Sequence, residues 1–283
     1  MLCEGTVLPY SRVTVARCTH VEIARIVTST RAVQAAVILG AGGGKVIDSV
    51  RAAAAPMRVP SISCPTIASA DSPCRAISVV YTEAGVVESN PFHPTNSALV
   101  LVDSQVIMHS PVRTLIAGMG DALSTVFEAR ACIASGSPTR RQGLCTLATL
   151  AIAELRSKTG LADGVSALAA AHAVHNGLTV APETHAFMHG EKAAFGVIVE
   201  LMLENAPNAS LNEALRFSNS IGPPTTLADM GCAGISSEMI SQIAARATRE
   251  GEPIHHEPFK VTAAMVELAI QSADAAGRDF RTK

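Results

Sequence analysis

Short apolar runs alternate with helix-periodic segments over the first hundred residues. The run AVQAAVIL (32–39) is rich in apolar and β-branched residues, which predicts a buried strand. VIDSVRAAAA (46–55) places its apolar residues on one helical face, and VPSISCPT (59–66) predicts a second strand. A strand, a glycine turn, a helix and a strand within about thirty residues are typical of a right-handed βαβ unit.

The pattern changes near residue 108. A hairpin is predicted for 76–89, with its turn at Glu83-Ala84-Gly85, and a further buried strand for 97–103. Strand-like alternation is nearly absent after that strand, and helical periodicity takes over. The predicted helices cover 114–134, 143–156, 165–176, 190–204, 209–220, 236–249 and 262–276. We therefore predict an α/β domain over residues 1–108 and an all-α domain over residues 109–283.

Composition, net charge and cysteine count limit the classes of protein to which the chain can belong. The chain has 283 residues, 48% of them hydrophobic, and a formal net charge of -2, which argues against nucleic acid or an anionic membrane as a partner. A charged, apolar leader and a run of about eighteen apolar residues are both absent, so we expect a cytoplasmic protein without a membrane span. An odd number of cysteines without a CxxC pair indicates buried free thiols rather than a disulfide framework. They are Cys3, Cys18, Cys64, Cys74, Cys132, Cys145 and Cys232.

A glycine-rich turn, GAGGGK (40–45), follows the first predicted strand. It does not match a Walker A loop, and Lys45 stands where the third glycine of a GxGxxG pattern belongs. Glycines between a strand and a helix nevertheless allow backbone N–H groups to approach a pyrophosphate closely. Two interpretations of this segment therefore remain open: a phosphate-binding loop, or a plain tight turn with a solvated lysine.

Four histidines gather between residues 172 and 189. His172 and His175 share one face of a predicted helix, whereas His189 begins the next helix after a loop interrupted by Pro182. Asp121 is a carboxylate within the apolar helical stretch TLIAGMGDALSTVF, where an ionised group is costly unless it is paired or metal-bound. Two histidines and one carboxylate form a catalytic zinc or iron arrangement. Buried core histidines remain the alternative, and His185 and the His255-His256 pair are interpreted as loop residues.

Five motifs in this order resemble one known family. They are GAGGGKVIDS, PTIASADSPCRAISVVYT, GMGDALSTVFEARAC, LAAAHAVHNGLT and HGEKAAFG. The chain from about residue 17 onwards closely resembles the glycerol dehydrogenases of the iron-containing alcohol dehydrogenase superfamily. The resemblance implies an α/β NAD-binding domain, an all-α metal-binding domain and a homo-oligomer. The implied reaction is NAD-dependent oxidation of glycerol at C2 to dihydroxyacetone, with one divalent metal, usually zinc, although iron is possible.

The resemblance also implies roles for particular residues. Asp121, His172 and His189 match the metal ligands. Asp71 matches a residue that meets the glycerol hydroxyls, and His175 lies beside the metal without being a ligand. The positions that match cofactor contacts are Gly43, Gly44, Lys45, Asp48, Thr66, Ser69, Ile77 and Tyr81.

Several departures from the family keep alternatives open. The family has a strand, a helix and a strand before the matched region, and a longer helical hairpin between residues 155 and 168, so a sheet edge is expected to be exposed. Arg75 replaces a small polar residue near the cofactor. An impaired remnant that keeps the metal but binds NAD poorly is one alternative, and a dehydrogenase of another small vicinal diol is a second. A dehydroquinate-synthase-like cyclisation is a third, disfavoured because few lysines and arginines lie near the motifs.

Overall fold

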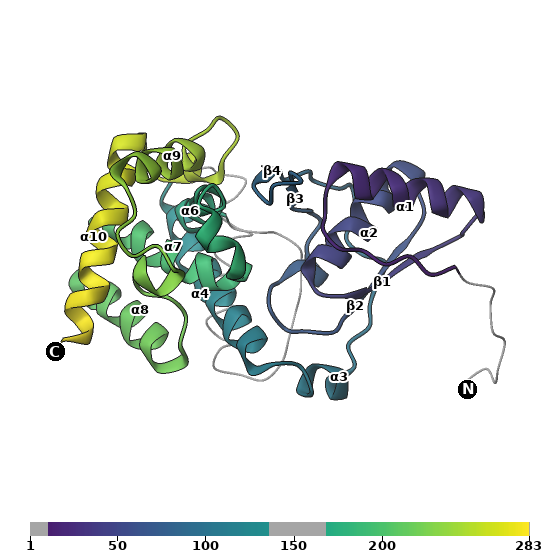
Figure 1. The fold of residues 1–283 in the computed structure, drawn as a ribbon, viewed down its shortest axis with the longest axis horizontal. Helices are drawn as coiled ribbons and strands as arrows, with labels where there is room; N and C mark the ends of the chain where they lie inside the picture. The colour runs from purple at the N-terminus through teal and green to yellow at the C-terminus, as the bar shows by residue number, and fades with distance from the viewer. Residues whose placement is uncertain (1–10, 136–167, 283) are drawn as a thin grey trace.

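The computed structural model describes residues 11–135 and 168–282. Figure 1 shows an α/β part formed by the first hundred residues on one side and a bundle of helices formed by the later residues on the other. The predicted division into an α/β part and an all-helical part is confirmed for these residues. Within them, β5 (Leu99–Val100) is the last strand along the chain.

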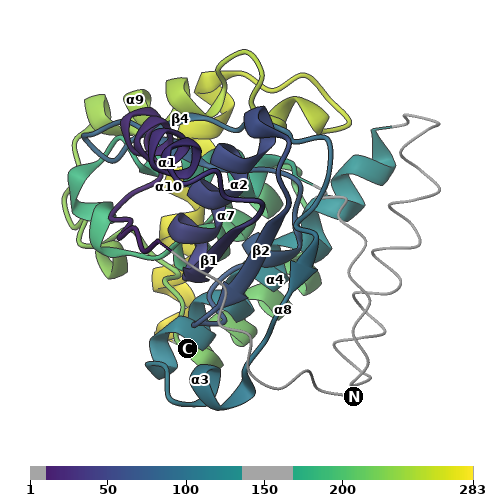
Figure 2. The same ribbon diagram turned by 90° about the vertical axis from the view of Figure 1, so that its right-hand side faces the viewer.

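A three-stranded parallel sheet is the centre of the α/β part, in the order β1-β2-β5. β1 (Ile38–Gly42) pairs with β2 (Ser61–Pro65), with Ile38 opposite Ser61, and β2 pairs with β5 through Ile62 and Leu99. The connection from β1 to β2 is α2 (Gly44–Met57), as the βαβ pattern predicts. α1 (His20–Ala32), which the hydrophobic pattern did not predict, packs against α2 (Figure 2).

The predicted boundaries need three corrections. Ala32 ends α1, and the first strand covers Ile38–Gly42 rather than 32–39, because parallel pairing with β2 holds Gly40 and Gly42 in extended conformation. The glycine turn predicted for 40–45 is therefore reduced to Gly43, since α2 already begins at Gly44. The strand predicted for 97–103 shortens to β5, because pairing with β2 extends only from Ala98 to Leu101, whose N–H groups donate to the carbonyl oxygens of Ser61 and Ser63.

The predicted hairpin is confirmed. β3 (Val80–Tyr81) pairs antiparallel with β4 (Val87–Ser89), and the register shifts between Val80 and Tyr81. Between the strands, Gly85 has a φ of 89°, a left-handed conformation that glycine adopts without steric cost.

The helical part is organised around α7 (His189–Leu203), whose residues 190–201 are all buried. Its partners are α4 (Val112–Ala134), α6 (Ala170–Leu178), α8 (Asn208–Ile221) and α10 (Ala263–Arg281), while α9 (Ser237–Ala247) packs on α6 and α10. A helix that is apolar on all sides belongs in the centre of a bundle. The helix predicted at 165–176 begins later, at Ala170, and the one predicted at 143–156 lies outside the described residues. Three short helices complete the described helical part: η2 (Pro182–Ala186), η3 (Ala228–Met230) and η4 (Pro253–His256). A further short helix, α3 (Ser104–Met108), lies between β5 and α4 along the chain.

Two smaller expectations also change. Cys64 and Cys74 are partly exposed, whereas Cys18, Cys132 and Cys232 are buried as predicted; Cys3 and Cys145 lie outside the described residues. His185 is exposed, but it belongs to η2 rather than to an irregular loop, and His255 and His256 end η4. Within the described part of the chain, no helix combines the length and apolar character that crossing a bilayer requires.

Candidate active site

Three helices bring Asp121, His172 and His189 together, and glycines allow the helices to approach closely. α4 and α7 cross at Gly190, where an added Cβ would lie 1.7 Å from the carbonyl oxygen of Ala117. α6 and α7 cross in the same way at Gly196, where a Cβ would lie 2.4 Å from the Ala171 oxygen. The absence of these side chains lets the backbones come near enough for the three polar residues to meet.

The polar atoms of this trio converge on one point. His189 Nε2 lies 3.1 Å and His172 Nε2 lies 3.5 Å from Asp121 Oδ1. All three atoms are buried without a hydrogen-bond partner, and one ligand atom from each residue falls within a group no wider than 4.8 Å. Orphaned buried atoms of this kind are costly unless a further group binds them. One carboxylate and two imidazoles are a donor set suited to zinc or iron(II).

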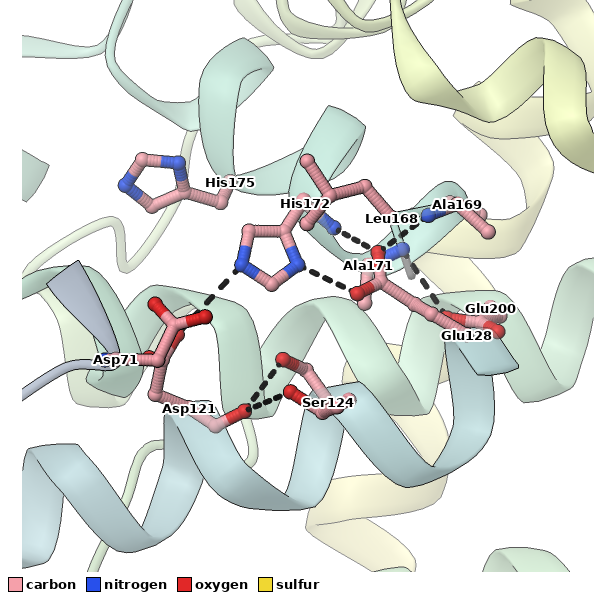
Figure 3. A network of polar contacts seen from close by, with 12 residues as sticks. Asp71, Asp121, Ser124, Glu128, Leu168, Ala169, Ala171, His172, His175 and Glu200 are labelled. Atoms are coloured by element: carbon pink, nitrogen blue, oxygen red, sulfur yellow. Dashed lines mark hydrogen bonds and ion pairs between the residues drawn. The ribbon is translucent and has the colours of Figure 1, made fainter. Parts of the chain in front are cut away.

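Glu128 orients His172 from two turns further along α4. His172 Nδ1 donates to Glu128 Oε2 at 2.5 Å, so Nε2 is the nitrogen left for a ligand (Figure 3). Glu128 Oε1 also accepts from the backbone N–H groups of Ala169 and His172, each at 2.8 Å. The same carboxylate therefore caps the start of α6 and sets the orientation of its imidazole.

The charges of the trio depend strongly on one another. Burial alone would lower the pKa of His172, but the Glu128 and Asp121 carboxylates outweigh it and raise this pKa to about 10. Burial would raise the pKa of Asp121, yet the nearby imidazoles of His189 and His172 hold it well below its usual range. A site that attracts a proton so strongly also favours a metal cation in its place.

Asp71 approaches the trio from the α/β part. Its backbone N–H donates to Asp121 Oδ2 at 2.9 Å, and its side chain forms an ion pair with Arg75 at 2.8 Å. Gly118 permits this approach, because a Cβ there would lie 2.2 Å from the carbonyl oxygen of Ala68. Burial raises the pKa of Asp71 to about 7, with Arg75 opposing the shift and Asp121 adding to it.

His175 lies against His189, with the ring centroids 4.1 Å apart, and is not part of the converging trio. Its Nδ1 donates to Asn176 Oδ1 at 3.0 Å, and its buried Nε2 has no hydrogen-bond partner. Burial, followed by the charges of His189, Lys192 and His172, holds its pKa well below the usual range, so the ring is neutral. Asn176 is held in turn by Glu252, which pairs with Arg246.

A cavity of about 470 Å³ lies beside the trio, and residues of both the α/β part and the helical part line it. Of the residues proposed from the sequence, Gly43, Gly44, Lys45, Asp48, Ser69, Tyr81, His175 and His189 line it. Thr66, Asp71, Ile77, Asp121 and His172 are not among its lining residues. Thr66 follows β2 and donates its backbone N–H to Gly42, and Ile77 is buried with its backbone oxygen bound to Arg51.

The glycine loop has the geometry of an anion site at the start of α2. Gly43 is the N-cap, and an added Cβ there would lie 2.8 Å from Ile67 Cδ1. The first turn of α2 contains no acidic residue, and Gly43, Gly44, Lys45 and Val46 line the cavity, so the positive end of the helix dipole faces it. Lys45 lies 6.0 Å from the centroid of the Tyr81 ring.

Asp48 has a supporting position in this loop. Its carboxylate accepts from Arg51 at 3.0 Å, from Ser72 Oγ at 2.5 Å and from the backbone N–H of Val79 at 3.1 Å. Arg51 continues the network to the carbonyl oxygens of Ser72 and Ile77. The pair therefore joins α2 to the segment that carries Asp71.

Sequence reasoning missed the residues that support the trio. Glu128 was detectable, because it lies seven residues after Asp121 and so shares a face of one helix. Arg51 was detectable in part, because Asp48 lies three residues before it on the same helix, but its bond to Ile77 arises only in the fold. Glu252 offered no such signal, because its partner Asn176 is distant in sequence.

Comparisons with known proteins show the family to which the chain belongs. A family model described as iron-containing alcohol dehydrogenase matches residues 5–104. The glycerol dehydrogenase of Citrobacter freundii is 38% identical over 295 residues, covering 93% of this chain and 81% of that protein. The chain belongs to the iron-containing alcohol dehydrogenase family.

Other members of the family support the same placement. The glycerol dehydrogenase of Escherichia coli O6:H1 is 40% identical over 295 residues, covering 93% of this chain and 80% of that protein. Among solved structures, a probable glycerol dehydrogenase from Sinorhizobium meliloti superposes with a TM-score of 0.86 at 36% identity, covering 93% of this chain and 83% of that one. The alignments span more positions than the 283 residues of this chain, so these relatives carry residues without a counterpart here.

Proposed function

We propose that this member of the family oxidises glycerol at C2 to dihydroxyacetone, with NAD⁺ as the hydride acceptor. The observation that carries the proposal is the convergence of three orphaned buried atoms from Asp121, His172 and His189 beside the cavity that the glycine loop also lines. The relatives named glycerol dehydrogenase support the choice of substrate.

Asp121, His172 and His189 are the proposed metal ligands. A divalent ion held there would act as a Lewis acid on a bound vicinal diol and lower the pKa of its hydroxyl groups. Glu128 fixes the imidazole of His172, and the backbone N–H of Asp71 fixes Asp121. Zinc is the metal we propose, because a carboxylate with two histidines is a common catalytic zinc set, with iron(II) as the competing ion.

NAD is the proposed cofactor, and it would supply the acceptor carbon for the hydride. The N-terminus of α2, with Gly43, Gly44 and Lys45, is placed to bind its pyrophosphate. Ser69 and Tyr81 line the rest of the cavity. Thr66 and Ile77 lie behind this wall, since their contacts are made within the protein. Asp48 lines the cavity, but its carboxylate is bound by Arg51.

Asp71 and His175 complete the proposed chemistry. Asp71 is adjacent to Asp121 and partly exposed, so its carboxylate is placed to accept a hydrogen bond from a substrate hydroxyl. His175 is neutral and keeps a bare Nε2 next to His189, so this nitrogen can accept a hydrogen bond from the substrate hydroxyl.

Two coarser features belong to the same proposal. We place the domain boundary near residue 108, between α3 and α4, with residues 1–108 forming the cofactor domain and 109–283 the metal domain. We also propose a homo-oligomer, because exposed apolar side chains cluster along 99–115. They are Leu99, Leu101, Val102, Val106, Met108, Val112 and Leu115. Light scattering of the purified protein would test this part.

The deciding experiment measures metal content and NAD⁺-dependent glycerol oxidation on one purified, monodisperse sample. We expect about one zinc per chain and NADH production, both lost in His172→Ala because the trio loses a ligand. His255→Ala is the matched control, since His255 is exposed in η4 outside the trio and should leave both unchanged. Metal without NADH production from glycerol or propane-1,2-diol, or NADH production that survives His172→Ala, would refute the proposal.

A further inference from the structure

Arg75 is a buried cation whose position in the cavity the proposed glycerol chemistry does not explain. It directly follows η1 (Ser72–Cys74), is only 5% exposed and lines the cavity. Its Nε lies 2.8 Å from Asp71 Oδ1, but that nitrogen has no properly aligned hydrogen-bond partner. A guanidinium carries five N–H donors, so the single contact with Asp71 leaves donors for a ligand.

The wall of the cavity has an excess of positive charge. The sequence separates its cations widely, but the fold brings Arg17, Lys45, Arg75 and Lys192 to one cavity. Asp48 lines the cavity as well, and its carboxylate is already bound by Arg51, Ser72 and Val79. Burial, together with the charge of Lys45, lowers the pKa of Lys192 to about 8. These cations therefore favour an anionic ligand.

Lys45 and Arg75 belong to different parts of the cavity wall. Lys45 lies at the N-terminus of α2, where the pyrophosphate of the cofactor is proposed to bind. Arg75 instead pairs with Asp71, whose backbone N–H holds the carboxylate of Asp121. A negative group bound by Arg75 would therefore lie on the side of the substrate.

We propose that Arg75 recognises a carboxylate on the substrate, and that the protein oxidises 2-hydroxy acids, including 2,3-dihydroxy acids, as well as glycerol. This inference rests on the proposed dehydrogenase function. A planar guanidinium can bind a carboxylate through two parallel hydrogen bonds, which a hydroxyl group cannot match. In the reaction the carbinol C–H bond breaks, the hydride with both electrons reduces NAD⁺ to NADH, the hydroxyl proton is released, and a 2-oxo acid forms.

Glycerate and glycerol are the matched substrates for the test, because they differ only in a terminal carboxylate in place of CH₂OH. We would measure kcat/KM for both with the wild-type protein, Arg75→Ser and Arg75→Lys. The wild type should oxidise glycerate, and Arg75→Ser should lower the ratio of the glycerate value to the glycerol value by about 100-fold, as losing a charged hydrogen-bonded pair implies. Arg75→Lys should lie between the two, because it keeps the charge without the two-pronged geometry.

A binding measurement separates this inference from the function on which it rests. Calorimetry with glycerate and NADH forms a complex that cannot react, and its Kd should rise in Arg75→Ser by a similar factor. The inference is overturned if wild-type protein that oxidises glycerol neither binds nor oxidises glycerate, if Arg75→Ser changes both substrates equally, or if Arg75→Ser improves NAD affinity. Glycerate binding that depends on Arg75, without oxidation of glycerol, would refute the proposed function and leave the recognition role standing.

Discussion

Glu257 should make the protein less stable as the pH rises towards 8. This residue follows η4, is 5% exposed, and accepts one hydrogen bond at Oε1, from the backbone N–H of Ala170 at 3.1 Å. Its Oε2 has no partner, and Glu200, Glu204 and Glu257 lie close enough to share one small site. Burial, followed by the charge of Glu204, raises the pKa of Glu257 from its ordinary 4.5 to about 8.

The sign of the effect follows from linkage. Between pH 4.5 and 8 the unfolded chain has lost the Glu257 proton while the folded protein still binds it, so ionisation favours unfolding. The free energy of unfolding therefore falls across this window and levels off above it. A difference of 3.5 pKa units, from 4.5 to 8, corresponds to at most about 5 kcal/mol at about 1.4 kcal/mol per unit. Relaxation around buried charges reduces such penalties, so we expect about 2–3 kcal/mol.

Glu257→Gln removes the titrating proton and keeps a carbonyl oxygen for Ala170. Urea unfolding should show the variant about 2 kcal/mol more stable than the wild type at pH 8 and close to it at pH 5. Glu252→Gln is the matched control, because Glu252 directly precedes η4 as Glu257 directly follows it. Its carboxylate is paired with Arg246 and Asn176, so its loss should destabilise the protein by about 3 kcal/mol at both pH values.

The reasoning fails if Glu257→Gln is no more stable than the wild type at pH 8. A loss of stability at that pH would mean that the carboxylate is ionised in the folded protein and neutralised by a cation.

Three further predictions concern the metal trio. Glu128→Gln should weaken metal affinity about 10- to 100-fold, because the imidazole of His172 loses the carboxylate that orients it. Competition with a chromogenic chelator would measure the affinity. An unchanged affinity would show that Glu128 does not orient His172 for metal binding. Gly190→Ala should cost at least about 3 kcal/mol in thermal unfolding, since its Cβ would collide with the Ala117 carbonyl, whereas Gly251→Ala, in open space at a φ of 85°, should cost about 1 kcal/mol. Removing the metal by dialysis against a chelator should lower the free energy of unfolding by about 3 kcal/mol, compared with a sample that contains the metal at a hundred times its Kd. The ion that restores both stability and activity identifies the native metal.

The pattern of the chain was enough to predict the βαβ unit, the hairpin and most of the described helices, because helical and strand periodicities are local properties. Spacing alone already proposed Asp121, His172 and His189 as a metal set, with buried core histidines as the alternative, and the resemblance implied the same three residues. Local pattern was also enough to mark Asp121 as unusual, since a carboxylate in an apolar helix requires a partner. Element boundaries were less accurate, as Gly40 and Gly42 show, because a parallel partner strand outweighed their turn preference.

Tertiary structure alone decided how the pieces meet. Backbone contacts at Gly190 and Gly196 set the distances between the three ligand atoms, and they join helices that are remote in sequence. Glu257 sits beside the start of α6, 87 residues away along the chain, and Arg75 joins cations from three separate segments at one cavity. Burial and the charges of distant residues set the ionisation of Glu257 and Arg75. Both influences arise only when distant segments pack together, so they cannot be read from a local pattern of residues.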